Sequence, residues 1–308
     1  MRNNHCKERV VANKNILHMI TPLKHMSPFD VNMALDAGYD AVVTYANVTL
    51  DEVTGLVQDA IFSRPPKLGA RTAMFFGGKN ASLALDMLAK AKTALVPPFG
   101  ISFLSDPGGS FTTAAAMMAC VEKTLRDKKQ RDLKRAKVAV FGATGVLGFA
   151  AAAIAALEGA DVTMVGYDGI RRVSEGAGEI KTRFGVDVTS ADGSDDEKKA
   201  GILAATEVAV CCGRAGVRVL TRAQIAAARS LLVAADANAV PPSGIEGLEA
   251  MANGVALTTH GALGIGPLAI GNIKYKTESG LFQRMIAAAK PVQLDIREAF
   301  ALARELNG

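Results

Sequence analysis

The sequence predicts a two-domain α/β protein, with each domain built on a parallel β-sheet. Short apolar segments alternate with longer helical ones along the chain of 308 residues, a pattern typical of β-α-β units. One charged run, at 126–137, interrupts this pattern, and we interpret it as a solvated helix end and linker. The 30 glycines and abundant alanines favour close packing of helices on a parallel sheet.

Four strand–helix pairs are predicted before the linker. The strands are at 15–20, 41–45, 72–76 and 101–105, and the helices that follow them are at 27–40, 49–62, 80–92 and 110–128. Ser27 is the expected N-cap of the first helix, followed by Pro28, and Gly38 is its stop signal. Thr49 and Glu52 have the spacing of a capping box at the second helix.

The alternation restarts after the linker. Strands are predicted at 137–142, 161–166, 206–213 and 230–238, and helices at 146–159, 169–185, 266–290 and 291–308. We therefore divide the chain into a disordered tail at 1–14, an N-terminal α/β domain at 15–128 and a second domain at 129–290. The last helix, 291–308, is expected to fold back onto the first domain.

Composition excludes several classes of protein. The net charge of +5 is scattered along the chain, which suits anionic small molecules better than nucleic acid. Four cysteines are present, at positions 6, 120, 211 and 212, without a C-x-x-C pair, so we expect neither disulfides nor a zinc site and place the protein in a reducing cytoplasm. No apolar run reaches the roughly 18 residues of a membrane span, and the polar N-terminus does not resemble a signal peptide.

A glycine-rich turn follows the strand at 137–142. Gly142, Gly145 and Gly148 are spaced G-x-x-G-x-x-G, and Ala143 stands where the first glycine of a G-x-G-x-x-G fingerprint would be. The turn joins a buried strand to an alanine-rich helix, so main-chain N–H groups at the helix start are free to bind a pyrophosphate. The context predicts a Rossmann-like parallel-sheet dinucleotide-binding domain.

The next strand ends in a turn with mixed signals for the choice of cofactor. Asp168 lies 20 residues beyond Gly148, where an acidic residue that binds the ribose of NAD is expected. Arg171 and Arg172 follow directly and are suited to the 2′-phosphate of NADP. We therefore expect either NAD or NADP to bind, with a mixed preference.

The sequence lacks the usual acid–base groups of several dehydrogenases. None of the four tyrosines is followed four residues later by lysine, and no histidine has an evident carboxylate partner, although His25 and His260 lie in predicted loops. No metal-binding spacing is present. A hydride transfer that needs no proton transfer fits this absence, since a methylene carbon between two nitrogens can lose hydride directly.

Several longer segments carry a family resemblance. They include ILHMITPLKHMSPFDVNMALDAGYDAVVTYANVTLDEV, FFGGKNASLALDM, DPGGSFTTAAAMM, DANAVPPSGIEG and GALGIGPLAIGNIKYKTE. From about residue 15 to the C-terminus, the chain resembles the bacterial NAD(P)-dependent methylenetetrahydromethanopterin dehydrogenases. The resemblance implies oxidation of the methylene pterin to its methenyl form in formaldehyde oxidation, with no metal, in a homo-oligomer that is a trimer in the family.

The resemblance also implies site residues. The expected dinucleotide-binding residues are Gly142, Ala143, Thr144, Gly145, Val146, Leu147, Gly148, Tyr167, Asp168, Arg171, Cys212, Gly213, Asp236 and Asn238. The expected pterin-binding residues are Lys24, His25, Ser27, Asp30, Gly77, Gly78, Lys79, Ser110, Phe111 and Thr112. Lys274 matches a lysine of the family and is assigned to orienting the pterin or anchoring an anionic group. Tyr167 stands where strictly NADP-dependent relatives have arginine, which weakens the case for strict NADP use.

Two other functions remain open at this stage. Related folate enzymes that also act as cyclohydrolases carry a Tyr-x-x-x-Lys element, which is missing here, so we expect no cyclohydrolase activity. A methylenetetrahydrofolate dehydrogenase and a catalytically silent NADP-binding sensor are the alternatives. A shikimate-type dehydrogenase is disfavoured because its lysine–aspartate pair is not recognisable.

Overall fold

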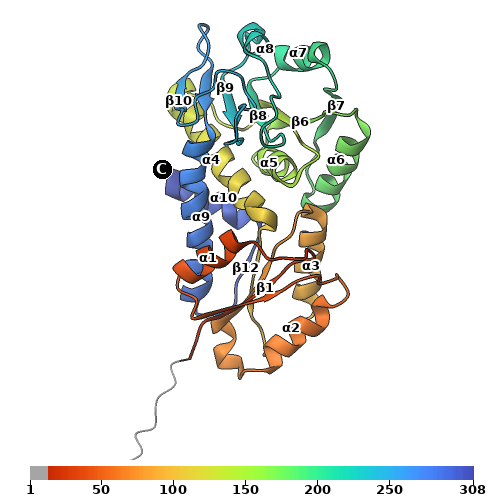
Figure 1. Ribbon diagram of the computed structural model, residues 1–308, viewed down its shortest axis with the longest axis vertical. Coiled ribbons are helices and arrows are strands. Elements are labelled where there is room, and N and C mark those ends of the chain that lie inside the picture. Colours follow the sequence, from red (N-terminus) through yellow and green to blue (C-terminus); the bar gives the residue numbers. More distant parts are fainter. Residues whose placement is uncertain (1–12) are drawn as a thin grey trace, which may run out of the picture.

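The computed structural model describes residues 13–308, so most of the predicted tail, with His5 and Cys6, lies outside the described residues. Two β-sheets lie toward opposite ends of the long axis, and long helices run between them (Figure 1). We call the part around the first sheet the pterin lobe and the part around the second sheet the dinucleotide lobe, after the ligands predicted for them. Within the described residues, no helix is long and apolar enough to cross a membrane.

The sheet of the pterin lobe has five parallel strands in the order β12-β4-β3-β1-β2. Their bounds are β1 (Ile16–Ile20), β2 (Ala41–Tyr45), β3 (Thr72–Phe76), β4 (Ser102–Ser105) and β12 (Gln293–Leu294). Every residue of β3 and β4 is buried, as expected for parallel strands covered on both faces. The strand order changes direction between β1 and β3, and ligands of open parallel sheets bind at such a point.

Three helices lie between the strands of this sheet in the sequence: α1 (Pro28–Asp36), α2 (Val53–Phe62) and α3 (Ala81–Thr93). The predicted start of α1 is confirmed, because the Ser27 hydroxyl accepts a hydrogen bond from the Asp30 amide. The predicted capping box of α2 is wrong. Glu52 accepts from both the amide and the hydroxyl of Thr49, but the helix begins only at Val53, and the Thr49 hydroxyl therefore donates instead of capping. A short 3-10 helix, Pro66–Arg71, precedes β3.

The sheet of the dinucleotide lobe has seven strands in the order β10-β11-β9-β8-β5-β6-β7. The bounds are β5 (Lys137–Phe141), β6 (Asp161–Gly166), β7 (Thr189–Asp192), β8 (Val208–Cys211), β9 (Val233–Asp236), β10 (Asn253–Ala256) and β11 (Leu263–Ile265). Six strands are parallel and only β10 is antiparallel. From β7 to β11 the order is the doubly wound order of dinucleotide-binding sheets, with its change of direction between β5 and β8.

Four helices belong to this sheet: α5 (Val146–Leu157), α6 (Arg171–Phe184), α7 (Asp196–Ala204) and α8 (Arg222–Ala227). Strands β7, β10 and β11 and helices α7 and α8 were not predicted. The sequence of β7 is Thr-Ser-Ala-Asp, and none of its residues is fully buried, so it carries no apolar signal. Pairing with β6 decides that it is a strand.

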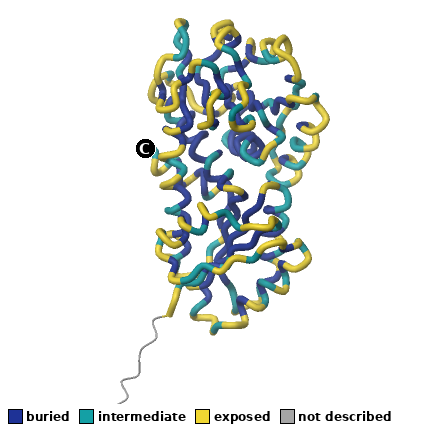
Figure 2. Tube along the Cα trace, viewed as in Figure 1, coloured by how far each residue is buried: buried dark blue, intermediate teal, exposed yellow. Residues whose placement is uncertain are grey.

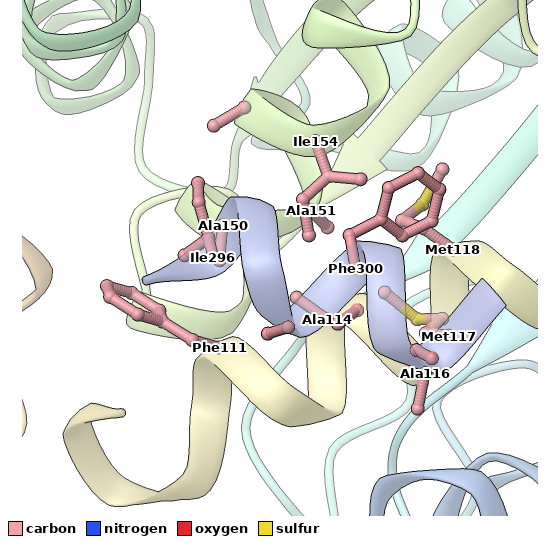
Figure 3. Packing of buried hydrophobic residues seen from close by; sticks show 14 of the residues in the cluster. Phe111, Ala114, Ala116, Met117, Met118, Ala150, Ala151, Ile154, Ile296 and Phe300 are labelled. Carbon is pink, nitrogen blue, oxygen red and sulfur yellow. The ribbon is translucent and has the colours of Figure 1, made fainter. Parts of the chain in front are cut away.

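Helices α4 (Ser110–Lys129), α9 (Pro267–Ala287) and α10 (Ile296–Asn307) join the two sheets. Figure 3 shows Phe111 and Met117 of α4, Ile154 of α5 and Phe300 of α10 in one packed cluster. Runs of buried alanine on α4 and α5 let these helices approach closely. The same cluster contains residues of both sheets, and buried segments continue from one lobe into the other in Figure 2. The lobes therefore share a hydrophobic core.

Candidate active site

The glycine-rich turn after β5 needs glycine at two of its three positions. Gly142 has φ +77°, and a Cβ atom there would lie 2.6 Å from the Cys212 carbonyl carbon and oxygen. A Cβ at Gly148 would lie 2.6 Å from the Gly142 carbonyl oxygen, so this glycine lets α5 pack against the turn. At Gly145 the nearest atom is 3.6 Å away. The turn thus packs tightly against the protein at Gly142 and Gly148, whereas the space beside Gly145 is free for a ligand.

A cavity of about 560 Å³ lies over this turn. Its walls include Gly142, Thr144, Gly145, Tyr167, Cys212 and Gly213, which all belong to the predicted dinucleotide set. Three basic residues that sequence analysis did not select also line it: Lys199, Arg214 and Arg218. Since phosphates are anionic, the open turn and these cations fit a dinucleotide. Only the spatial proximity of α7 and of the segment after β8 could have identified the three cations.

A second cavity of about 430 Å³ opens on the other side of the turn. Ala143, Thr144, Gly145 and Val146 line it from the dinucleotide lobe, and Lys79 lines it from the pterin lobe. Leu147 does not line either cavity and packs against the hydrophobic core. The predicted pterin loop after β3 therefore faces the predicted pyrophosphate turn.

Asp236 and Asn238 lie at the carboxyl end of β9, as expected, and their side chains bond to nearby main-chain groups. The Asp236 carboxylate accepts hydrogen bonds from the amides of Asn238 and Ile245, both at 3.0 Å. The Asn238 side chain accepts from the amides of Gly216 and Val240 and donates to a proline carbonyl. The Asp236 side chain orders the loop after β9, and the Asn238 side chain connects that loop to the loop after β8. Neither residue lines the two cavities.

The loops that follow β1 and β3 meet at the change of direction in the first sheet. Gly78 has φ +119°, and a Cβ atom there would lie 3.2 Å from the ring of Pro22. The amide of Gly77 donates to the Ile20 carbonyl at 2.9 Å. Lys24 and His25 are exposed on the first of these loops. They lie where a ligand of this sheet is expected, but no hydrogen bond fixes their side chains in the described structure.

A buried ionic cluster lies beside these loops, and we call Asp30, Asp106, Lys274 and Glu278 the acid cluster. Lys274 donates from Nζ to Glu278 and lies 3.8 Å from the ring centroid of Phe29. Asp30 and Asp106 are 2% and 0% exposed, and Glu278 is also fully buried. One oxygen of Glu278, Oε1, has no hydrogen-bond partner. Three buried carboxyl groups thus interact with one ammonium group, Glu278 by direct contact and Asp30 and Asp106 through its charge.

Burial changes the protonation of this cluster. It raises the pKa of Asp30 to about 7 and that of Glu278 to about 8, and the negative charge of Asp106 adds to both shifts. The pKa of Asp106 is raised as well, chiefly by burial. Asp106 nevertheless accepts hydrogen bonds from the Phe111 amide at 2.8 Å and the Thr112 hydroxyl at 2.6 Å, which favour its ionised form. Near neutral pH burial therefore favours the protonated forms of Asp30 and Glu278, and a nearby positive charge would favour their ionised forms.

The three predicted residues at the start of α4 have unlike positions. Thr112 is buried and bonded to Asp106, so it belongs to the acid cluster. Phe111 points into the hydrophobic core, as Figure 3 shows, and only its main chain faces Asp106. Ser110 is half-buried at the first helical position. Thus the side chain of Phe111 is placed to support the site through packing rather than through contact with a ligand.

Sequence analysis missed two members of the acid cluster. Asp106 precedes a short 3-10 helix, Pro107–Gly109, and Glu278 lies one turn beyond Lys274 on α9. The Lys274–Glu278 spacing of four residues is visible in the sequence, but the carboxyl groups of Asp30 and Asp106 come from other elements. His260 lies between β10 and β11, and neither of its ring nitrogens has a hydrogen-bond partner. Among the residues that the structure describes, no group is arranged to hold a metal ion.

Comparison with known proteins gives consistent results. Residues 28–108 match the family model described as methylene-tetrahydromethanopterin dehydrogenase, N-terminal. The NAD(P)-dependent methylenetetrahydromethanopterin dehydrogenase of Methylorubrum extorquens is 50% identical over 96% of this chain and 99% of its own length. The bifunctional protein MdtA of the same organism is 32% identical over 91% of this chain and 94% of its own.

The fold also resembles that of a distantly similar solved structure. The NAD-dependent malic enzyme of Thermotoga maritima superimposes with a TM-score of 0.56 at 12% identity, over 96% of this chain and 85% of the other. This likeness supports the two-lobed α/β fold.

Proposed function

Because the chain belongs to the family of methylenetetrahydromethanopterin dehydrogenases, we propose that it oxidises 5,10-methylenetetrahydromethanopterin to the methenyl form by direct hydride transfer to NAD⁺ or NADP⁺. The observation that carries the proposal is the 50% identity over nearly the full length of both chains. The open glycine turn supports it independently, because a dinucleotide needs such a turn.

We assign the ligands to the two lobes. Residues 129–290 would bind the dinucleotide, with the pyrophosphate on the turn from Gly142 to Gly148, and residues 15–128 would bind the pterin. The segment 291–308 would support the pterin side, since β12 pairs with β4 and α10 packs on α4. The second cavity supports this arrangement, because Lys79 and the glycine turn line it together.

Bound NAD(P)⁺ supplies the hydride acceptor. The residues of the chain then have to align the two ligands, exclude water and favour the positive charge that develops on the pterin. No residue needs to accept a proton, which fits the absence of a tyrosine–lysine or histidine–carboxylate pair from the sequence.

The acid cluster suits the electrostatic task. Its three carboxyl groups outnumber the single ammonium group of Lys274, so the cluster becomes negative as Asp30 and Glu278 lose their protons. A cation that forms nearby interacts strongly with buried carboxylates, because few water molecules screen them. Lys274 offsets part of this charge and, with a side chain that is 13% exposed, can orient the pterin.

An assay with two pterins and two dinucleotides tests this proposal. We expect methenyl product and reduced dinucleotide from the methanopterin substrate with both NAD⁺ and NADP⁺, and no hydrolysis of the methenyl product. Product from the folate analogue alone would instead support a methylenetetrahydrofolate dehydrogenase. Dinucleotide binding without turnover of either pterin would support a silent sensor, and rapid hydrolysis would contradict the lack of cyclohydrolase activity.

The family resemblance also carries our proposal for assembly and location. We propose a homo-oligomer, specifically a trimer, in the cytoplasm. The three described cysteines are free and buried, which is compatible with a reducing compartment. Sedimentation equilibrium of the full chain tests the assembly, and a monomer at micromolar concentration would contradict it.

A further inference from the structure

The turn after β6 contains a compact charged cluster. Arg172 donates from the same nitrogen, Nη1, to the Tyr167 hydroxyl and to the Asp168 carboxylate, at 3.0 Å each. Its guanidinium carbon is 5.8 Å from the centroid of the Tyr167 ring. Arg171 lies apart from this cluster. Its nearest acidic oxygen belongs to Glu175 at 3.9 Å, and its side chain is 86% exposed.

We propose that Arg172, and not Arg171, binds the 2′-phosphate of NADP, and that it does so by leaving Asp168, which accepts the ribose hydroxyls of NAD. This inference rests on the proposed dinucleotide site. The sequence made both Arg171 and Arg172 candidates for this phosphate, and only Arg171 was among the predicted site residues. The inference selects Arg172 instead.

The position of Arg172 supports this assignment. Arg172 lines the second cavity together with Thr144 and Gly145 of the glycine turn, and Tyr167 lines the first cavity with the same two residues. Arg171 lines neither cavity. Asp168 does not line them either, but its ion pair with Arg172 at 3.0 Å holds it beside the second cavity. Arg172 is therefore beside the turn on which the pyrophosphate would sit, and its planar fork of donors matches a phosphate.

Charge explains why Arg172 would exchange partners. While Arg172 is bound to Asp168, the pair is neutral and the carboxylate can still accept hydrogen bonds from two hydroxyl groups of NAD. A 2′-phosphate at the same place would be repelled by Asp168 unless a cation lies between them. The pair is exposed, with 43% and 37% of the two side chains accessible, so breaking it costs little. Because Arg172 can leave Asp168 at a small cost in free energy, the site can accommodate either dinucleotide.

Binding constants for NAD⁺ and NADP⁺, measured separately by calorimetry on the full-length protein, test the inference. Arg172→Gln should weaken NADP⁺ about tenfold or more, the loss expected for hydrogen bonds to a charged group, and change NAD⁺ binding much less. Asp168→Asn should weaken NAD⁺ and strengthen NADP⁺. Lys181→Gln, which removes another exposed cation of α6, serves as the control and should change neither constant.

Three results would overturn the inference: equal weakening of both dinucleotides by Arg172→Gln, unchanged NADP⁺ binding in that variant, or a selective loss of NADP⁺ in Arg171→Gln. If the unaltered protein binds neither dinucleotide, the proposed function itself fails, and the inference with it. If the unaltered protein binds both and turns over the pterin while the variants behave alike, the proposed function stands and only the assignment of Arg172 is wrong.

Discussion

Replacing Glu278 by Gln should change how the stability of this protein depends on pH. Glu278 is fully buried, and burial together with Asp106 raises its pKa from 4.5 to about 8. Between these two values the folded protein holds a proton on Glu278 that the unfolded chain has lost. The free energy of unfolding therefore decreases as the pH rises through this window. Glutamine has a similar shape and cannot ionise, so the variant lacks this decrease.

The size of the effect follows from the pKa change. At about 1.4 kcal/mol per pKa unit, the difference between 4.5 and about 8 corresponds to roughly 5 kcal/mol. Asp30, whose pKa is raised to about 7, competes for the same proton. The variant's free energy of unfolding, relative to that of the unaltered protein, should therefore increase by roughly 2–5 kcal/mol as the pH rises from about 5 to about 9. At the acid end the two proteins should have similar stability.

Urea unfolding at several pH values measures this difference directly. Glu249→Gln is the matched control, because Glu249 is an exposed glutamate away from the cluster, and its stability curve should follow that of the unaltered protein. Parallel stability–pH curves for Glu278→Gln and the unaltered protein would refute the view that burial holds a proton on this cluster. A variant that is less stable at alkaline pH would refute it as well, since the sign would be opposite.

Three further predictions concern the glycine turn and the lysine. Gly145→Val should fold normally, because no atom lies within 3.6 Å of the new Cβ, yet lose dinucleotide binding; retained affinity by calorimetry would remove this residue from the site. Gly148→Ala should lower the free energy of unfolding, measured in urea, by about 1–3 kcal/mol, because its Cβ would overlap the turn. The control Gly178→Ala, at an exposed position of α6 with open space around it, should raise the free energy of unfolding by about 0.5–1 kcal/mol. Equal effects of the two substitutions would contradict the packing argument. Lys274→Gln should lower kcat while leaving dinucleotide affinity nearly unchanged, and steady-state kinetics identical to those of the unaltered protein would exclude a role in orienting the pterin.

The sequence by itself determined most of the fold, because the signals involved are local. The Ser27–Pro28 start of α1 is recognisable over a few residues, and so is the strand–turn–helix around Gly142 and Gly148, since each follows from main-chain geometry that neighbouring residues impose. The reaction was predicted from the family resemblance, which extends over nearly the whole chain. Strands without an apolar pattern, such as β7, could not be predicted, because only pairing with β6 makes them strands.

Tertiary structure alone decided the electrostatics of the site. Asp30, Asp106 and Glu278 come from three distant parts of the chain, and their raised pKa values exist only because the fold buries them around Lys274. The structure also decided which of two adjacent arginines we assign to the 2′-phosphate. Arg171 and Arg172 cannot be distinguished by residue type, but only Arg172 bonds to Tyr167 and Asp168. A residue type fixes which charge is available, whereas burial and direction, which depend on distant parts of the chain, fix what that charge can do.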